Sequence, residues 1–160
     1  MNDRIPMTPT GYAKLLAEFK HHREVLRPKV VKDIEEARAH GDISENSEYE
    51  DAKDRQGHIE GRIRELESRL ALADVIDIAK VPPSDRVMFG VTVEMEDQDT
   101  GETALYRIVG MEEADARSGR ISYSSPIGKA LIGRAVGDEV RFDAPKGQRT
   151  VVITAVHYRP

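Results

Sequence analysis

The feature that most constrains the fold is a long helical repeat in residues 49–73. Apolar and small side chains recur there at alternating steps of three and four residues, with charged residues on the faces between them. The repeat positions are Tyr49, Ala52, Gln56, Ile59, Ile63, Leu66, Leu70 and Ala73. This spacing is the heptad seam of a coiled coil. Such a seam needs a second long helix to cover it.

The preceding segment predicts that second helix. Thr8 is a suitable N-cap, and Pro9 suits the first helical position. Apolar positions follow at helical spacing in Tyr12, Leu16, Phe19, Leu26, Val30, Ile34 and Ala37. Pro28 should kink or restart the helix, and Gly41 can take a left-handed conformation at its end. Two long helices joined by a short turn pack antiparallel, so residues 1–78 predict an antiparallel coiled-coil hairpin.

The second half of the chain has a different pattern. Residues 79–85 include the sequence Val-Pro-Pro-Ser-Asp, which indicates a linker. Short β-rich runs separated by turn residues follow at residues 87–89, 91–95, 103–109, 121–123, 140–142 and 150–156. One short helix is expected at residues 126–131. The predicted fold class is therefore α+β, with residues 86–160 forming a small antiparallel sheet with one helix.

Composition excludes several classes of protein. The chain has no cysteine, so disulfides and thiolate metal sites are excluded. It has neither an apolar run of the ~20 residues that a membrane span needs nor the apolar core of a secretion signal, so we expect a soluble, cytoplasmic protein without membrane contact. Residues 1–78 hold 13 basic and 17 acidic side chains, and residues 79–160 hold 11 and 12. Neither half is a nucleic-acid binder by bulk charge.

An acidic segment joins the two predicted helices. Asp42 and Glu45 should lie at the tip of the hairpin, where they cannot contribute to a core. Carboxylate oxygens are the hard ligands that Mg²⁺ prefers. The same spacing of three is also that of a capping box, with Asp42 as N-cap and Glu45 as the N3 residue. Acidic residues continue after them at Glu48, Glu50, Asp51 and Asp54, more than capping needs, although a solvated charge run explains many such stretches.

Basic side chains also line the predicted hairpin. Most should be ordinary solvated residues, but Arg38, Lys53 and Arg55 lie nearest the tip and are the candidates for contact with phosphate groups. The five histidines are scattered without zinc spacing, and the sequence contains neither a Ser/His/Asp pattern nor a phosphate loop. The sequence therefore gives little support for an intrinsic enzyme.

Several segments together resemble the Gre family of bacterial transcript-cleavage factors, most closely its GreA type. The resemblance runs almost from end to end. It is carried by residues 39–49 (AHGDISENSEY), 56–63 (QGHIEGRI), 106–110 (YRIVG) and 121–133 (ISYSSPIGKALIG). Each segment alone is moderate evidence for the family, whereas the four segments in this order and spacing are specific evidence for it.

The resemblance implies a coiled coil followed by an FKBP-like domain that docks on bacterial RNA polymerase. It implies that the coiled coil enters the secondary channel and reaches the 3′ end of backtracked RNA. Asp42 and Glu45 match the family's tip carboxylates, which share the polymerase's Mg²⁺ and stimulate its cleavage of RNA. The loop implicated in polymerase binding matches Ser124, Ser125, Pro126 and Ile127. The protein would thus activate a nuclease without being one, and we expect it to be a monomer when free.

Three alternatives remain at this stage. The same architecture could block the polymerase channel as an inhibitor, although the Asp42/Glu45 spacing favours activation. The C-terminal domain could be a prolyl isomerase or chaperone, but such a pocket normally has aromatic walls, and only 5% of residues are aromatic. The coiled coil could also be an adaptor without chemistry. If the GreA-type interpretation holds, the acidic residues beyond the tip favour release of short RNA fragments.

Overall fold

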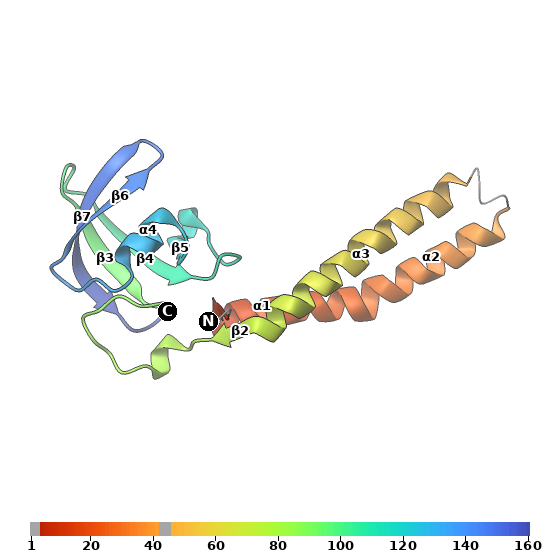
Figure 1. Cartoon of the computed structure of the whole chain (residues 1–160), viewed down its shortest axis with the longest axis horizontal. Coiled ribbons are helices and arrows are strands. Elements are labelled where there is room, and N and C mark those ends of the chain that lie inside the picture. The colour runs from red at the N-terminus through yellow and green to blue at the C-terminus, as the bar shows by residue number, and fades with distance from the viewer. Residues whose placement is uncertain (1–3, 42–45) are drawn as a thin grey trace. The chain divides into compact units, whose positions relative to one another are not determined.

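A computed structural model describes residues 4–41 and 46–160 (Figure 1). The described residues form two compact units. One is a helical unit of Tyr12–Ala73, and the other combines residues 4–11 with Asp74–Pro160. In the described part of the chain, no helix is long and apolar enough to cross a membrane.

The helical unit is the hairpin that the heptad pattern predicts. Its first arm comprises α1 (Pro9–His21), the π-helical turn η1 (His22–Leu26) and α2 (Arg27–Ala39), and its second arm is α3 (Ser47–Leu72). The predicted start is confirmed, since the Thr8 hydroxyl accepts the Gly11 N–H at 3.1 Å. The predicted disturbance at Pro28 is also confirmed, because α2 restarts with this residue in its first turn. Proline lacks a donor and crowds the preceding turn, and a wide π turn relieves that crowding.

The side chains packed between the arms are those of the predicted seam, except that the buried position in α1 differs by one residue. The most buried side chains of this unit are Leu15, Val30, Ile34, Ala37, Ala52, Ile63 and Leu66. In α1 the buried position is Leu15, whereas the repeat predicted Leu16, which is half-buried. The wide turn of η1 slows the rotation of the helix by about one residue, and this moves the buried position one step back.

Ion pairs that involve arginine join the two arms. Arg62 binds Glu18 through Nε at 2.7 Å and Nη2 at 2.9 Å, and Arg27 binds both oxygens of Glu60. Hydrogen bonding to Arg62 lowers the pKa of Glu18. Because these groups are partly exposed, solvent screening keeps the contribution of each pair small, but the two-pronged geometry favours one register of the arms.

The second unit is built on a curled five-stranded sheet. Its strands are β3 (Thr92–Asp97), β4 (Thr103–Val109), β5 (Arg120–Ser122), β6 (Glu139–Ala144) and β7 (Gly147–His157), in the order β5-β4-β3-β7-β6. The pairs are antiparallel except β4 with β5, which is parallel, so the prediction of a purely antiparallel sheet is wrong at this edge. The chain reaches β5 through a connection that includes the turn η4 (Ala116–Ser118), long enough to reverse direction.

The core of this unit lies between the sheet and α4 (Pro126–Leu131), the short helix expected from the sequence. The strand predicted at residues 87–89 does not form. Val87 and Phe89 are buried, but the only ladder contact beside them is an isolated bridge from Arg86 to Ala135. The buried apolar side chains are Ile78, Val87, Phe89, Val91, Val93, Met95, Ile108, Ile121, Leu131, Val140, Phe142, Val151 and Ile153.

Two further strands join the beginning of the first arm to the end of the second. They are β1 (Ile5–Met7) and β2 (Ala73–Val75), and η3 (Ile78–Lys80) follows β2. Nearby, Glu113 accepts hydrogen bonds from the Thr8 backbone N–H at 3.3 Å, from the Thr8 hydroxyl, and from the Gly110 N–H at 3.1 Å. A Cβ at Gly11 would lie 2.3 Å from the Glu113 carboxyl carbon. Thr8 and Gly11 are thus held against residues 110–113 within this unit.

One buried ion pair in the sheet predicts a pH dependence of stability. Asp97 is 4% exposed and accepts hydrogen bonds from Arg149 Nε and Nη2 at 2.9 and 2.6 Å. These bonds, with those from the Asp99 and Thr100 backbone N–H groups, lower the pKa of Asp97. A lowered pKa stabilises the folded state above the ordinary aspartate pKa of about 4, and the effect disappears as pH falls through the lowered value.

We therefore expect Asp97→Asn to lower the melting temperature at pH 7, and we expect the difference from the unaltered protein to shrink below about pH 4. Thermal unfolding between pH 3 and 7 measures this. Asp99→Asn, at an exposed neighbouring carboxylate, is the matched control. An Asp97→Asn difference of equal size at pH 3 and pH 7 would contradict the assignment.

Candidate functional site

The two ends that flank the acidic tip are well defined, whereas Asp42 and Glu45 themselves lie outside the described residues. On one side α2 ends at Ala39, and the His40 N–H donates to the Ala37 carbonyl at 3.2 Å. Gly41 follows with φ of 122°, a backbone conformation that favours glycine. On the other side Asn46 precedes α3.

The predicted capping box of Asp42 and Glu45 lies outside the described residues, but the start of α3 is described. A box with Asp42 as N-cap requires a helix that begins one residue later. Instead α3 begins at Ser47, and Asn46 is its N-cap, accepting the Tyr49 N–H at 3.1 Å. The start of α3 therefore requires neither Asp42 nor Glu45 as its cap.

Asn46 has a second contact that sequence reasoning missed. Its Nδ2 donates to the Ala37 carbonyl at 2.6 Å, so one side chain binds the end of α2 and the beginning of α3. Asparagine immediately before a helical repeat is a strong N-cap signal and could have identified the cap. The contact with Ala37 depends on how the arms pack and has no sequence signal.

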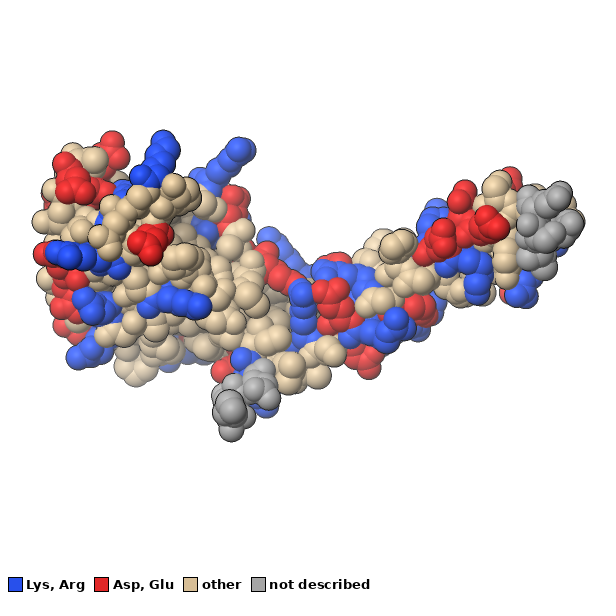
Figure 2. Space-filling view, turned by 45° about the horizontal axis from the view of Figure 1, so that its top comes forward, with Lys and Arg blue, Asp and Glu red and all other residues tan. Residues whose placement is uncertain are grey.

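The basic residues predicted to contact RNA lie on the arms near this end, but each has its own partner. The Arg38 guanidinium lies over the Tyr49 ring, 5.8 Å from its centre. Lys53 donates to the Gln56 side chain at 3.1 Å, and Arg55 donates to Asp33 on the opposite arm at 3.1 Å. Figure 2 shows basic and acidic side chains intermingled along the hairpin. The structure therefore does not gather these three residues into one basic cluster.

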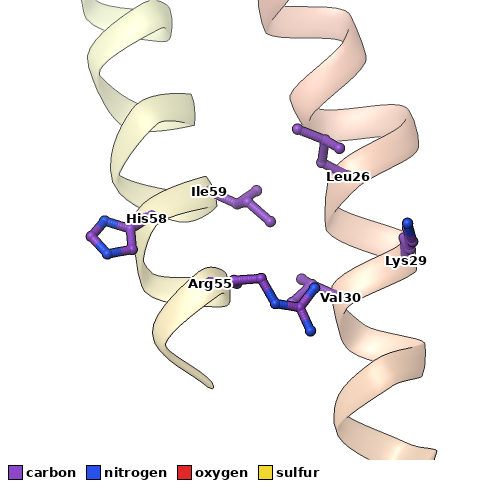
Figure 3. Close-up of a pocket in the computed structure, with 6 residues that line it drawn as sticks. All are labelled: Leu26, Lys29, Val30, Arg55, His58 and Ile59. Atoms are coloured by element: carbon purple, nitrogen blue, oxygen red, sulfur yellow. The ribbon is translucent and has the colours of Figure 1, made fainter. Parts of the chain in front are cut away.

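Arg55 also lines an apolar groove between the arms, with a volume of about 240 Å³. The other lining residues are Leu26, Lys29, Val30, His58 and Ile59. In Figure 3 the Arg55 and Ile59 side chains extend from α3 toward the first arm, whereas His58 points away from it. The groove thus combines an apolar floor with basic side chains.

Two of the acidic residues after the tip, Glu48 and Asp51, line a larger cleft of about 400 Å³ closer to the hairpin end. Glu48 and Asp51 lie on α3 and face Asp33 and Glu36 of α2 across this cleft. Glu48 pairs with His40 at 3.4 Å, an exposed contact. Among the residues that the structure describes, no group of three or more His, Asp or Glu side chains could hold a metal ion. The predicted Mg²⁺ contact therefore depends on Asp42 and Glu45 themselves.

The segment predicted to bind polymerase, residues 124–127, spans the end of the turn before α4 and the first two residues of that helix. Ser125 is the N-cap of α4: its hydroxyl accepts the Gly128 N–H at 3.1 Å and donates to the Ser122 carbonyl at 2.7 Å. The Ser124 hydroxyl is 2.8 Å from the Ser122 hydroxyl. Pro126 is exposed, whereas Ile127 packs against the core. The two serines thus shape the turn, and Pro126 is the residue that it presents to solvent.

These features define a two-part protein: a charged helical hairpin and a curled β-sheet unit with a stiff serine-proline turn. Two protein-family models match it, "Transcription elongation factor, N-terminal" over residues 5–75 and "Transcription elongation factor, GreA/GreB, C-term" over residues 82–158. The chain belongs to the GreA/GreB family of transcription elongation factors.

Individual relatives agree with this placement. A transcription elongation factor GreA of Rhodopseudomonas palustris is 50% identical over 99% of this chain and 100% of the relative. A GreA of Rhodospirillum rubrum is 52% identical over 98% of this chain and 99% of the relative. A solved structure, GreA factor homolog 1 of Thermus thermophilus, is 32% identical with a TM-score of 0.43, covering 96% of this chain and 99% of that one. The sequence identity to the two GreA relatives confirms the resemblance to the GreA type.

Proposed function

We propose that this protein binds bacterial RNA polymerase and stimulates the polymerase's own cleavage of backtracked RNA, which rescues arrested complexes. The observation that carries the proposal is the full-length match to GreA elongation factors. The geometry adds support, because the two ends flanking Asp42 and Glu45 are held together and α3 uses another residue as its cap. The activity belongs to the polymerase, and the protein acts in the cytoplasm as its activator.

Docking is assigned to the turn of residues 124–127 in the C-terminal unit, for which we propose an FKBP-like fold. Pro126 is exposed at the start of α4, and Ser125 fixes its position through two hydrogen bonds. A surface that is already rigid loses little conformational entropy when a partner binds it. The hairpin would then enter the secondary channel of the polymerase, with residues 42–45 leading.

The two tip carboxylates fit a shared Mg²⁺ by the chemistry of their oxygens. A divalent ion in such a site can activate water and stabilise the charged oxygens of a phosphoryl displacement. Asp42 and Glu45 would complete the ligand set of an ion that the polymerase holds mainly by itself. Asn46 and Ala37 contribute by fixing the two ends of the segment that carries these carboxylates.

Nascent RNA near its 3′ end would contact Arg38, Lys53 and Arg55. Each of these residues has a local partner in the free protein, but the contacts are exposed and contribute about 0–1 kcal/mol, so phosphates can replace them. Acidic residues lie beside them in the cleft, including Glu48 and Asp51. They oppose a long RNA contact, and we therefore propose that short fragments are released.

A cleavage assay on halted elongation complexes tests the function. RNA labelled at its 5′ end should shorten when the purified protein and Mg²⁺ are added, and RNA labelled at its 3′ end should yield short fragments. Undiminished RNA length despite normal polymerase binding would contradict the proposal and would instead support the channel-blocking alternative.

A further inference from the structure

We infer that Asn46 is a positioning residue for the tip carboxylates, acting by fastening the two arms of the hairpin where residues 42–45 leave and rejoin them. Its Nδ2 donates to the Ala37 carbonyl at 2.6 Å and its Oδ1 accepts the Tyr49 N–H at 3.1 Å. The bonds differ in kind, because one joins the arms and the other caps α3. The catalytic part of this inference rests on the proposed function, whereas the structural part does not.

The bonding of the Ala37 carbonyl explains why this fastening is effective. Ala37 is 3% exposed, and its carbonyl also accepts the His40 N–H at 3.2 Å in the last turn of α2. An oxygen at a helix end otherwise lacks a partner inside the helix, and Asn46 fills its remaining bonding capacity. Asn46 is itself partly buried. Both partners are therefore sheltered from the water that would compete for these bonds.

Other contacts across this end of the hairpin are weaker. Arg38 lies 5.8 Å from the centre of the Tyr49 ring, near the outer limit for a cation–π contact. The His40–Glu48 pair is 3.4 Å long, with side chains 65% and 72% exposed. Solvent and salt screen such exposed contacts. Within residues 4–41 and 46–160, Asn46 therefore provides the most sheltered of these connections between the two arms at this end.

The two bonds can be separated by substitution. Asn46→Asp keeps an oxygen for the Tyr49 N–H, and aspartate is as good an N-cap as asparagine. It removes the donor to Ala37 and places a carboxylate oxygen against a carbonyl oxygen. Asn46→Ser also keeps a capping oxygen but is too short to reach both partners. These variants therefore test the fastening without removing the cap on which folding of α3 depends.

The first measurement needs no polymerase. The chain has no cysteine, so Ala39→Cys and Glu50→Cys allow two spin labels to be placed on exposed positions of the two arms. Pulsed electron paramagnetic resonance should give a narrow distance distribution in the otherwise unaltered protein and a distinctly broader one with Asn46→Asp. Asp42→Asn with Glu45→Gln should leave the distribution narrow. Identical distributions with and without Asn46→Asp would overturn the inference.

The second measurement is the cleavage rate as a function of factor concentration. Asn46→Asp should lower the maximal stimulated rate about five- to tenfold, as expected for losing one sheltered hydrogen bond or slightly more. The half-saturating concentration should stay within about twofold, because docking uses the other unit. An undiminished maximal rate would overturn the inference, and so would a loss confined to the half-saturating concentration.

The double variant separates the two possible failures. If the unaltered protein does not shorten the RNA, the proposed function fails. If Asp42→Asn with Glu45→Gln stimulates cleavage fully, the proposed role of the two carboxylates fails, whatever Asn46 does. If that variant is inactive while Asn46→Asp retains the full maximal rate, only the positioning role fails.

Discussion

Replacing Asp42 with asparagine and Glu45 with glutamine should abolish stimulated RNA cleavage, with a loss on the order of 100-fold in the maximal rate. Both changes keep the size of the side chain and remove only its charge. Neutral amides are weaker ligands for Mg²⁺, so the tip would still arrive but could not complete the ion's ligand set. Affinity for polymerase should be largely kept, because the docking residues lie in the other unit.

Glu48→Gln with Glu50→Gln provides the matched control. These carboxylates lie in the first turn of α3, and Glu48 has only an exposed partner. Neutralising them removes the same amount of charge from the same end of the hairpin, so a general effect of charge would appear in both pairs. An adaptor without chemistry predicts that neither pair matters. Full cleavage with the Asp42/Glu45 pair neutralised would refute the role of the tip.

Gly128→Ala should have the largest effect on the folded structure. Gly128 is buried in α4, and a Cβ there would lie 2.1 Å from the Ser122 carbonyl oxygen and 3.1 Å from the Ser125 hydroxyl. Backbone cannot move aside as a flexible side chain can, so the start of α4 must shift. We expect a loss of about 3 kcal/mol in the free energy of unfolding. Denaturant unfolding measures this loss directly.

The same substitution should weaken polymerase binding by displacing the turn of residues 124–127. Lys129→Ala is the matched control, because it also places alanine in α4 but at an exposed position. Its free energy of unfolding should stay within about 0.5 kcal/mol of the unaltered protein. An unchanged free energy of unfolding for Gly128→Ala would show that stability does not require the close approach of Gly128 to Ser122.

The elements that sequence predicted correctly are those with strong periodicity or clear end signals. The heptad seam predicted α3, Thr8 and Pro9 marked the start of α1, and Ser125 with Pro126 marked α4. The elements it missed depend on distant partners. The strands β1 and β2 have three residues each, too few for a period, and the buried run at residues 87–89 looks like a strand although it has no neighbouring strand to pair with. The parallel edge at β5 is likewise set by a connection rather than by composition.

The candidate site shows the same difference between features set by local sequence patterns and features set by contacts between distant residues. Residue types and their order predicted the tip carboxylates and the turn before α4, because those patterns are local, and the functional roles of both stay predictions. The partners of Arg38 and Arg55 could not be predicted, since Tyr49 and Asp33 lie on the opposite arm and meet them only after packing. Asn46 combines both cases: its capping role has a local signal, but its bond to Ala37 does not.

The most direct test of the account is the Mg²⁺ dependence of RNA cleavage by halted polymerase. If Asp42 and Glu45 supply ligands to an ion that the polymerase holds weakly, adding the protein should lower the half-maximal Mg²⁺ concentration severalfold, and the Asp42→Asn, Glu45→Gln variant should not. An equal half-maximal Mg²⁺ concentration with the unaltered protein, with the variant and with polymerase alone would contradict it.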